Sequence, residues 1–268
     1  MAEIVMDRPR TGRPDSTGQR LLLIIIGVLS GAIVLEIVFH LAIAPLFTIK
    51  RVVVESELTI SRDRILEIAR IDGSEDFFSL DTGTLVRNLE QYHPVKSATA
   101  EKVFPDVVRI VIEARKPVAV AFASENGRSI PLLIDEEGVV FHKGAAGVKD
   151  WSLPILSGVQ FQQVTVGTRL PALLQPFLED LQTLKLESPV HFDLISEFRV
   201  VKKGEYEMEV VLYPVSHRVP VRIGNSIDED LCNALIVALD VLDAQGTLER
   251  VREIDFRTGE IVYRLREG

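Results

Sequence analysis

One uninterrupted apolar segment near the N-terminus limits what this chain can fold into. Residues 21–35 contain no charged side chain, and the apolar character continues past Glu36 to about Phe39. As a helix, residues 21–35 are only about 22 Å long at ~1.5 Å per residue. Continuation to Phe39 closes the gap to the roughly 30 Å hydrocarbon core of a bilayer. We therefore predict a transmembrane helix over residues 21–45, after a disordered, Arg-rich and Pro-rich tail over residues 1–20.

The charges on either side of this segment predict its orientation. Four arginines precede it and two basic residues follow it, namely Arg8, Arg10, Arg13 and Arg20, then Lys50 and Arg51. Because arginine-rich ends stay in the cytoplasm, we expect a cytoplasmic N-terminus and an extracytoplasmic bulk of the chain. Ala42-Ile43-Ala44 has the small-x-small form of a signal-peptide cleavage site. The apolar region is long for a signal peptide, and Pro45 would directly follow the cut, so an uncleaved anchor is preferred.

Two features of the predicted span have both a functional and a structural interpretation. Gly27 and Gly31 form a GxxxG pair, which lets two helix backbones approach closely and would support a homodimer, although such pairs also arise by chance. Glu36 is an intramembrane carboxylate and therefore a functional candidate. Its structural interpretation is a side chain that snorkels to the outer headgroups.

The composition narrows the classes of function. A net charge of -9 argues against a general nucleic-acid binder, whose affinity depends on clustered cations, but leaves protein partners open. The single cysteine, Cys232, excludes an internal disulfide and a multi-cysteine metal site, and we expect it to be a buried small hydrophobe. We accordingly predict no cofactor and no metal.

The sequence contains no recognisable catalytic constellation. A Gly-rich phosphate loop, an HExxH motif and a nucleophile elbow are all missing from it. His191, Asp193 and Ser196 could supply acid-base chemistry, but triads are assembled in space and these three are neighbours in an expected polar loop. We therefore predict that the protein is not an enzyme.

The first 70 residues after the span predict a small sheet covered by two helices. A strand over residues 47–55 is followed by a helix capped by Ser61, a helix starting at Asp81 or Thr82, and two strands within residues 94–117. In the last strand, alternate residues are apolar and the residues between them include charged ones, which is the period of a half-buried strand.

These residues resemble a POTRA domain. The matching pieces are Phe47-x-Ile49-x-x-Val52-x-Val54, Pro94-Val95-x-x-Ala98, Phe104-Pro105 and Glu113-x-x-x-Pro117-Val118-Ala119. Placed directly after a single N-terminal span, the unit is similar to that of the FtsQ/DivIB family of bacterial cell-division proteins. The resemblance implies a POTRA domain over residues 46–116.

The second half of the chain continues the resemblance. Strands are expected over residues 118–123, 132–134, 197–201, 207–213, 219–223, 252–256 and 260–266, with an Asn126-Gly127 turn after the first of them. Helices are expected over residues 171–185 and after a capping box at Ser226-Ile227-Asp228-Glu229. The pieces similar to family signatures are residues 135–141 (D-x-x-G-x-V-F), residues 153–158 (LP-x-L-x-G) and Ile254-Asp255-Phe256-Arg257 (IDLR), although the usual RY-x-x-G continuation is shortened to Arg257-Thr258-Gly259.

The expected fold class is α+β. It comprises the single N-terminal transmembrane helix, the POTRA domain with three strands and two helices, and a mainly antiparallel FtsQ-type β-domain with two helices over residues 117–268.

A sheet edge can bind a partner protein by accepting a strand from it. The candidate residues lie in the last strand and are Glu260, Ile261, Val262, Tyr263 and Arg264. From the residues alone, an edge strand and an interior strand are equally good interpretations. The resemblance implies the edge, because in FtsQ-like proteins the C-terminal edge of the β-domain receives FtsB, which acts with FtsL, while the POTRA domain contributes to recruitment.

The preferred functional hypothesis is therefore a bitopic scaffold that binds and recruits division proteins at the septum. One alternative is a POTRA-bearing envelope transport or assembly component that binds passing polypeptides. Its outer-membrane members end in a transmembrane β-barrel with many alternating strands, for which the C-terminal half is too short. A membrane-tethered hydrolase is a further alternative, disfavoured by the missing catalytic site.

Overall fold

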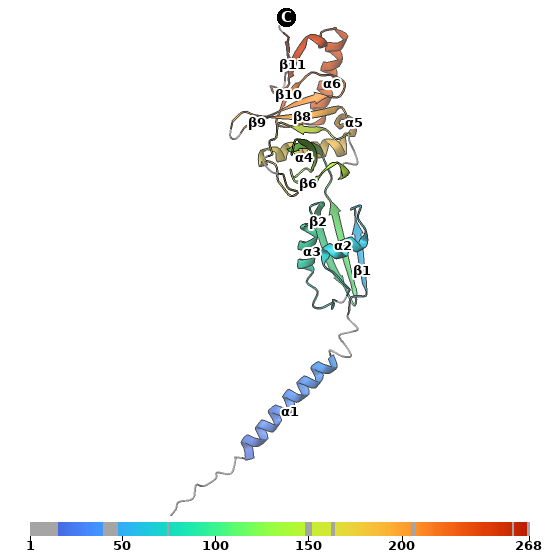
Figure 1. Ribbon diagram of the computed structural model, residues 1–268, viewed down its shortest axis with the longest axis vertical. Coiled ribbons are helices and arrows are strands. Elements are labelled where there is room, and N and C mark those ends of the chain that lie inside the picture. Colours follow the sequence, from blue (N-terminus) through green and yellow to red (C-terminus); the bar gives the residue numbers. More distant parts are fainter. Residues whose placement is uncertain are drawn as a thin grey trace, which may run out of the picture. The chain divides into compact units, whose positions relative to one another are not determined.

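A computed structural model describes residues 16–39, 48–73, 75–147, 152–161, 164–204, 207–258 and 260–266 (Figure 1). Its first element is helix α1 (Ser16–Val38). Within the described ranges, the stretch Gly18–Val38 is the one helix long and apolar enough to cross a membrane, with a mean hydropathy of 2.8. Most of the predicted tail, the end of the predicted span and the Ala42-Ile43-Ala44 motif lie outside the described residues.

The chain divides into two compact units. The first unit runs to Glu55 and includes Ser61–Val86 and Thr99–Val111, and the second is made of Ser56–Ile60, Arg87–Ala98 and Ile112–Gly268. The division crosses the smaller of the two sheets, because its strands β2 (Val95–Val103) and β3 (Val107–Ala114) each have residues in both units.

The smaller sheet has the strand order β1-β3-β2, with β1 at Arg51–Ser56. Helices α2 (Arg62–Ala69) and α3 (Thr82–Glu90) connect β1 to β2, as the sequence predicts. Ser61 caps α2 by accepting a hydrogen bond from the Arg64 N–H at 3.2 Å. The expected alternation of β3 is confirmed, since every second residue is buried, namely Val108, Ile110 and Ile112.

The larger sheet has nine strands in the order β12-β11-β10-β9-β8-β7-β4-β5-β6. The bounds are β4 Ala119–Glu125, β5 Arg128–Ile134, β6 Val140–Lys143, β7 Ile155–Ser157, β8 Ile195–Lys202, β9 Met208–Pro214, β10 Val221–Gly224, β11 Val251–Asp255 and β12 Val262–Leu265. The pairs β4–β7, β7–β8 and β10–β11 are parallel and the others are antiparallel. The α+β fold class is therefore confirmed, with a mixed and mainly antiparallel sheet.

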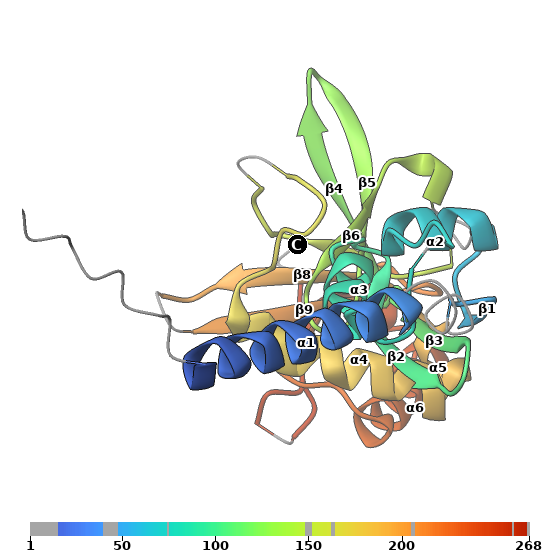
Figure 2. The same cartoon turned by 90° about the horizontal axis from the view of Figure 1, so that it is seen from below.

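Helices and turns complete this unit. Helices α4 (Gln175–Glu187) and α6 (Glu229–Ala244) bury apolar faces in the same core as the strands, and a short helix α5 (Pro189–Phe192) follows α4. Short 3-10 helices lie at Ala145–Gly147, Ala172–Leu174 and Leu248–Arg250. The β4–β5 hairpin, which projects in Figure 2, has the expected Asn126-Gly127 turn, with φ angles of 51° and 73°.

Two details of the sequence prediction are wrong. Helix α6 is capped by Asp228, whose carboxylate accepts the Leu231 N–H at 2.8 Å, so Ser226 lies two residues before the cap. The last strand covers Val262–Leu265 and not all of residues 260–266, because the ladder to β11 begins only at Val262. The predicted turn Arg257-Thr258-Gly259 lies partly outside the described residues, since its glycine does.

Candidate partner-binding site

Strand β12 lies at one edge of the nine-stranded sheet, and β11 is its one neighbour among the described strands. The pairing is antiparallel, with Val262 opposite Asp255, Tyr263 opposite Ile254 and Arg264 opposite Glu253. Among the predicted binding residues, Val262, Tyr263 and Arg264 belong to this strand, while Glu260 and Ile261 lie directly before it. The structure therefore places the predicted residues together at a sheet edge.

The hydrogen bonds of β11 determine which main-chain groups of β12 point outward. The Ile254 N–H donates to the Pro220 carbonyl at 3.0 Å, so the main-chain groups of Ile254 point toward β10. Successive residues of a strand direct their main-chain N–H and C=O groups to opposite sides. The main-chain groups of Glu253 and Asp255 therefore point toward β12.

The same alternation applies to β12. Val262 and Arg264 face Asp255 and Glu253 and use their main-chain groups to bond β11. The alternate positions direct their N–H and C=O groups away from the sheet, namely Ile261, Tyr263 and Leu265. This row of outward groups can hydrogen-bond a further strand.

The side chains of β12 present a different chemistry on each face. Tyr263 lies opposite Ile254, which is fully buried in the core, yet Tyr263 is 44% exposed. Leu265, on the same face, is 42% exposed. These two residues extend the apolar layer of the core onto the edge strand β12. A strand added beside β12 could cover them. Arg264 points to the opposite, charged face.

That charged face carries a cross-strand ladder of alternating sign, one residue on each of four neighbouring strands. Arg222 on β10 bonds Glu209 on β9 with an Nη2–Oε2 distance of 2.9 Å, and its Nη1 lies 3.5 Å from Glu253 Oε2 on β11. Glu253 Oε1 in turn accepts a hydrogen bond from Arg264 Nη1 on β12 at 2.9 Å. The ladder ends on a cation whose side chain is 65% exposed. Opposite charges across neighbouring strands stabilise a sheet.

Glu209 is buried at the inner end of this ladder. The Arg222 guanidinium, which hydrogen-bonds it, lowers the pKa of the Glu209 carboxyl, and Lys203 and Arg257 lie 3.2 and 3.4 Å from it. Arg257 also binds Asp255 through two side-chain bonds and its own N–H, which lowers the pKa of the Asp255 carboxyl to about 2. Asp255 and Arg257 of the IDFR segment thus hold the chain that leads into β12.

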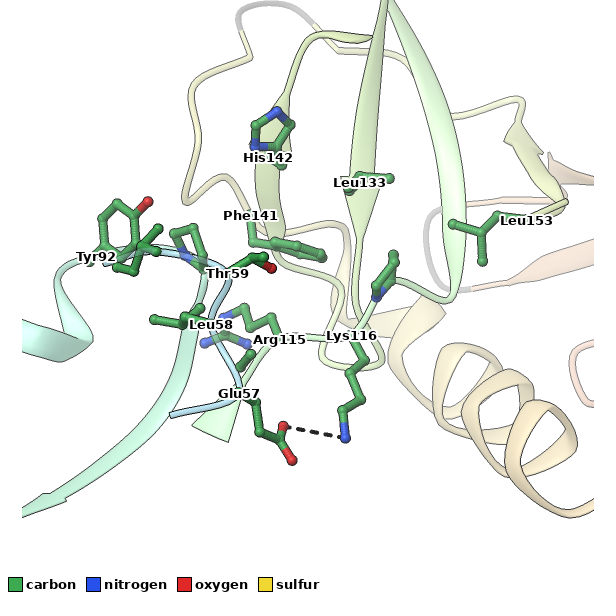
Figure 3. Close-up of a pocket in the computed structure, with 14 residues that line it drawn as sticks. Glu57, Leu58, Thr59, Tyr92, Arg115, Lys116, Leu133, Phe141, His142 and Leu153 are labelled. Atoms are coloured by element: carbon green, nitrogen blue, oxygen red, sulfur yellow. Dashed lines mark ion pairs between the residues drawn. The ribbon is translucent and has the colours of Figure 1, made fainter. Parts of the chain in front are cut away.

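The second unit also contains a cavity of about 640 Å³, open to solvent, which Figure 3 shows. Its apolar wall includes Leu58, Leu133, Phe141 and Leu153. Its polar wall includes Arg115, His142 and the exposed ion pair between Glu57 and Lys116, whose Oε2 and Nζ lie 3.4 Å apart. A cavity of this composition can hold an apolar side chain of a ligand or partner.

Arg115 connects this cavity to a buried cluster. Its guanidinium pairs with Asp135, which is fully buried, and lies 2.8 Å from Glu137 Oε2. Burial raises the pKa of the Asp135 carboxyl, while the Val139 N–H, which donates to it at 2.7 Å, and Arg115 act in the opposite direction. The acidic turn of the D-x-x-G signature therefore serves as an anchor for Arg115.

Two of the candidate catalytic residues, His191 and Ser196, hydrogen-bond different parts of the chain. His191 lies in α5 and bonds Asn233 at 2.9 Å, while Ser196 lies in β8 and donates to the Tyr213 carbonyl at 2.8 Å. Cys232 is buried as expected, and burial raises the pKa of its thiol to about 12. In the described part of the chain, no group of three or more His, Cys, Asp or Glu residues is arranged to hold a metal.

The chain is similar to proteins named as bacterial cell-division proteins. Residues 47–115 match the FtsQ-type POTRA domain. The chain is 22% identical to the cell division protein DivIB of Clostridium acetobutylicum over 83% of its own length and 85% of that protein. It is 26% identical to the cell division protein FtsQ of Syntrophotalea carbinolica over 67% of its length and 60% of that protein. Koribacter versatilis FtsQ is 31% identical over 37% of this chain and 27% of the relative.

The chain belongs to the FtsQ/DivIB family. The resemblance predicted from the sequence is therefore confirmed, together with the FtsQ-type POTRA domain. Members of this family are division proteins that are generally not catalytic, and membership implies that the partners of this chain are other division proteins.

Two features of this FtsQ/DivIB protein are not predicted by the sequence analysis. The charge ladder brings together residues from positions 209 to 264, and its register depends on a parallel crossover from β10 through α6 to β11. The cavity is lined by six separate stretches of chain. Alternating charge in β10 and β11 was the available hint of the ladder.

The predicted helix-pairing residues lie on one face of α1, four residues apart. Apart from the adjoining residues and the backbone of α1 itself, a methyl group added at Gly27 or Gly31 would meet no described atom within 4 Å. The face is therefore open for close approach of a second helix, and pairing through it stays a prediction.

Proposed function

We propose that this FtsQ/DivIB protein is a bitopic membrane scaffold of the division machinery, which binds other division proteins at the septum and has no catalytic activity. The observation that carries the proposal is the edge position of β12, with its outward main-chain groups and the charge ladder that ends at Arg264. Strand addition at such an edge gives affinity through main-chain bonds and specificity through alternate side chains.

The chemistry of the edge defines the partner segment. A strand added beside β12 continues the ladder if it places an acidic side chain next to Arg264, since that cation ends the alternation. On its other face the same strand covers Tyr263 and Leu265 with apolar side chains. We propose an FtsB-like protein, acting with an FtsL-like protein, as the source of this strand.

The remaining parts have supporting roles in the proposal. Helix α1 anchors the chain in the cytoplasmic membrane with the N-terminus inside, because the preceding segment is rich in arginine. A POTRA domain over residues 46–116 recruits further division proteins, and a β-domain over residues 117–268 carries the strand-addition site.

A pair of variants at Tyr263 tests the strand-addition site. Tyr263→Pro removes one outward N–H, whereas Tyr263→Val also removes the phenol ring but keeps that N–H. We expect the proline variant to lose capture of an FtsB-like partner and septal recruitment of that partner, and the valine variant to retain most of both. Equal capture by the two variants and the wild type would show that β12 does not accept a strand.

Depletion of the protein tests the wider role. Cells without it should form filaments that lack completed septa, as expected for a division scaffold. Normal division together with a defect in envelope assembly would contradict the proposal and favour a transport component.

A further inference from the structure

We propose that one end of the first unit binds the surface of the membrane in which α1 is anchored. The surface consists of Phe78, Val103 and Phe104, with Lys102 beside them, and we name it the aromatic tip. This inference rests on the proposed membrane anchor. It concerns a lipid surface and is independent of strand addition at β12.

The aromatic tip is an ordered cluster of apolar side chains that remain exposed. Phe77 is buried and holds two outer rings edge-on, with centroid distances of 5.5 Å to Phe78 and 6.0 Å to Phe104. These outer rings are 60% and 67% exposed, and Val103 is 40% exposed. Scattered exposed apolar residues are ordinary, but adjacent ones supported from below indicate an interaction surface.

The aromatic tip is held beside the point where the described chain resumes after α1. The Ile49 N–H donates to the Glu75 carbonyl at 3.1 Å, and the Lys50 N–H donates to the Asp106 carbonyl at 3.0 Å. Glu75 and Asp106 belong to the two loops that carry Phe78 and Phe104. The loops that carry the two rings therefore lie at the end of the small sheet where β1 starts.

The length of chain fixes how far this end can be from the bilayer. Phe39 is the last described residue of the apolar helix and Thr48 is the next described residue. Nine Cα-to-Cα steps reach no farther than about 30 Å. A surface tethered so closely meets the membrane at a high effective concentration, so modest apolar contacts suffice to hold it there.

The charges around the aromatic tip suit a bilayer surface. Lys102 Nζ lies 5.7 Å from the Phe77 ring centroid and donates to the Phe78 carbonyl at 3.3 Å, which leaves a cation beside the exposed rings. Two nearby carboxylates are used within the protein. Glu75 accepts the N–H groups of two preceding residues, and Asp106 pairs with Lys50 at 3.7 Å. Apolar rings next to a cation are the features of an interfacial membrane contact.

Tryptophan fluorescence of the full chain in lipid nanodiscs tests the inference. The nanodiscs contain phosphatidylethanolamine and phosphatidylglycerol with brominated acyl chains, which quench tryptophan emission. The background variant Trp151→Phe removes the single native tryptophan. In that background, Phe104→Trp and Phe78→Trp place reporters on the aromatic tip. Phe39→Trp places one at the end of α1, and Val111→Trp places one at an exposed site of β3 in the same unit.

We expect brominated lipid to remove most of the emission from the reporters at 39, 78 and 104 and to leave that at 111 unchanged. Full emission at 78 and 104, together with quenching at 39, would overturn the membrane contact while leaving the anchor intact. Full emission at 39 as well would overturn the anchor itself. If the reporters at 78 and 104 change only when another division protein is added, the aromatic tip binds protein and the inference is wrong.

Discussion

The guanidinium of Arg264 on β12 donates a 2.9 Å hydrogen bond to Glu253 on β11, and the same carboxylate lies 3.5 Å from Arg222 on β10. Glu253 therefore separates two cations that would otherwise face each other across the end of the sheet. The last strand has exposed side chains throughout, and this carboxylate adds a side-chain bond to its main-chain pairing with β11.

Glu253→Lys should consequently loosen β12. The new cation lies between Arg222 and Arg264, and like charges on neighbouring strands destabilise a sheet, so we expect the free energy of unfolding to fall by about 1–2 kcal/mol. Hydrogen exchange of the Val262 and Arg264 amides should accelerate, and capture of an FtsB-like partner should weaken. Glu249→Lys, which changes an exposed acid outside both the charge ladder and the predicted binding residues, is the matched control. Unchanged exchange at β12 in Glu253→Lys would show that the ladder does not hold the strand.

Arg115→Ala should be among the most damaging single changes in the second unit. It leaves the fully buried Asp135 without its cation, and breaking a buried pair in this way costs about 3–5 kcal/mol. Urea unfolding measures the loss. Lys116→Ala removes the neighbouring exposed pair with Glu57 and should cost no more than about 0.5 kcal/mol. Equal losses from the two variants would contradict the buried role of Arg115.

Removal of the buried charge tests the cause of that loss. If the cost of Arg115→Ala comes from an unpaired Asp135 carboxylate, the double variant Arg115→Ala with Asp135→Asn should recover part of the free energy of unfolding. A double variant that is less stable than Arg115→Ala would instead assign the loss to packing of the Arg115 side chain.

The sequence predicts side-chain faces well and strand neighbours poorly. The burial of Val108, Ile110 and Ile112 follows from a period of two, and the Asn126-Gly127 turn follows from local backbone preference. Neither rule says which strand lies beside which. The edge position of β12 depends on the parallel placement of β11 beside β10, and a single sequence encodes that pairing only through the global packing of α6 and the core.

The candidate site shows the same limit. Five residues of the terminal segment could be selected because of composition and position in the chain. Glu209 and Arg222, which continue the charge ladder inward from Glu253, belong to strands about 55 and 40 residues before Arg264. The cap of α6 shows the same limit on a smaller scale. Ser226 and Asp228 could each accept the capping hydrogen bond, and only the packed helix selects Asp228.

Acid should weaken the fold through Asp255. Its carboxyl has a pKa of about 2 in the folded protein against an ordinary value of 3.8, because Arg257 binds the charged form. The stabilisation is complete above pH 3.8, declines as the pH falls, and is lost below about pH 2. Since Arg257 is partly exposed, we expect a contribution of no more than about 2 kcal/mol.

Asp255→Asn measures this contribution. The variant should be less stable than the wild type at neutral pH, and the difference should shrink as the pH is lowered from 4 to 2. Asp243→Asn, which alters one exposed acid on α6, is the matched control. A difference between Asp255→Asn and the wild type that stays constant over this range would show that the carboxyl is not held in its charged form by Arg257.

Gly158 ends the LP-x-L-x-G segment, and the structure gives the physical reason for glycine there. It has a φ of 80°, and an added Cβ would lie 2.1 Å from the Val200 carbonyl oxygen of the parallel strand β8. Because the obstacle is main chain, no rotamer change can relieve it, and β7 must move away from β8. We expect Gly158→Ala to lower the free energy of unfolding by about 3 kcal/mol or more.

Gly204→Ala adds the same methyl group in open space and should change stability by less than about 0.5 kcal/mol. Similar unfolding midpoints for the two variants would mean that the close approach of β7 to β8 does not require glycine.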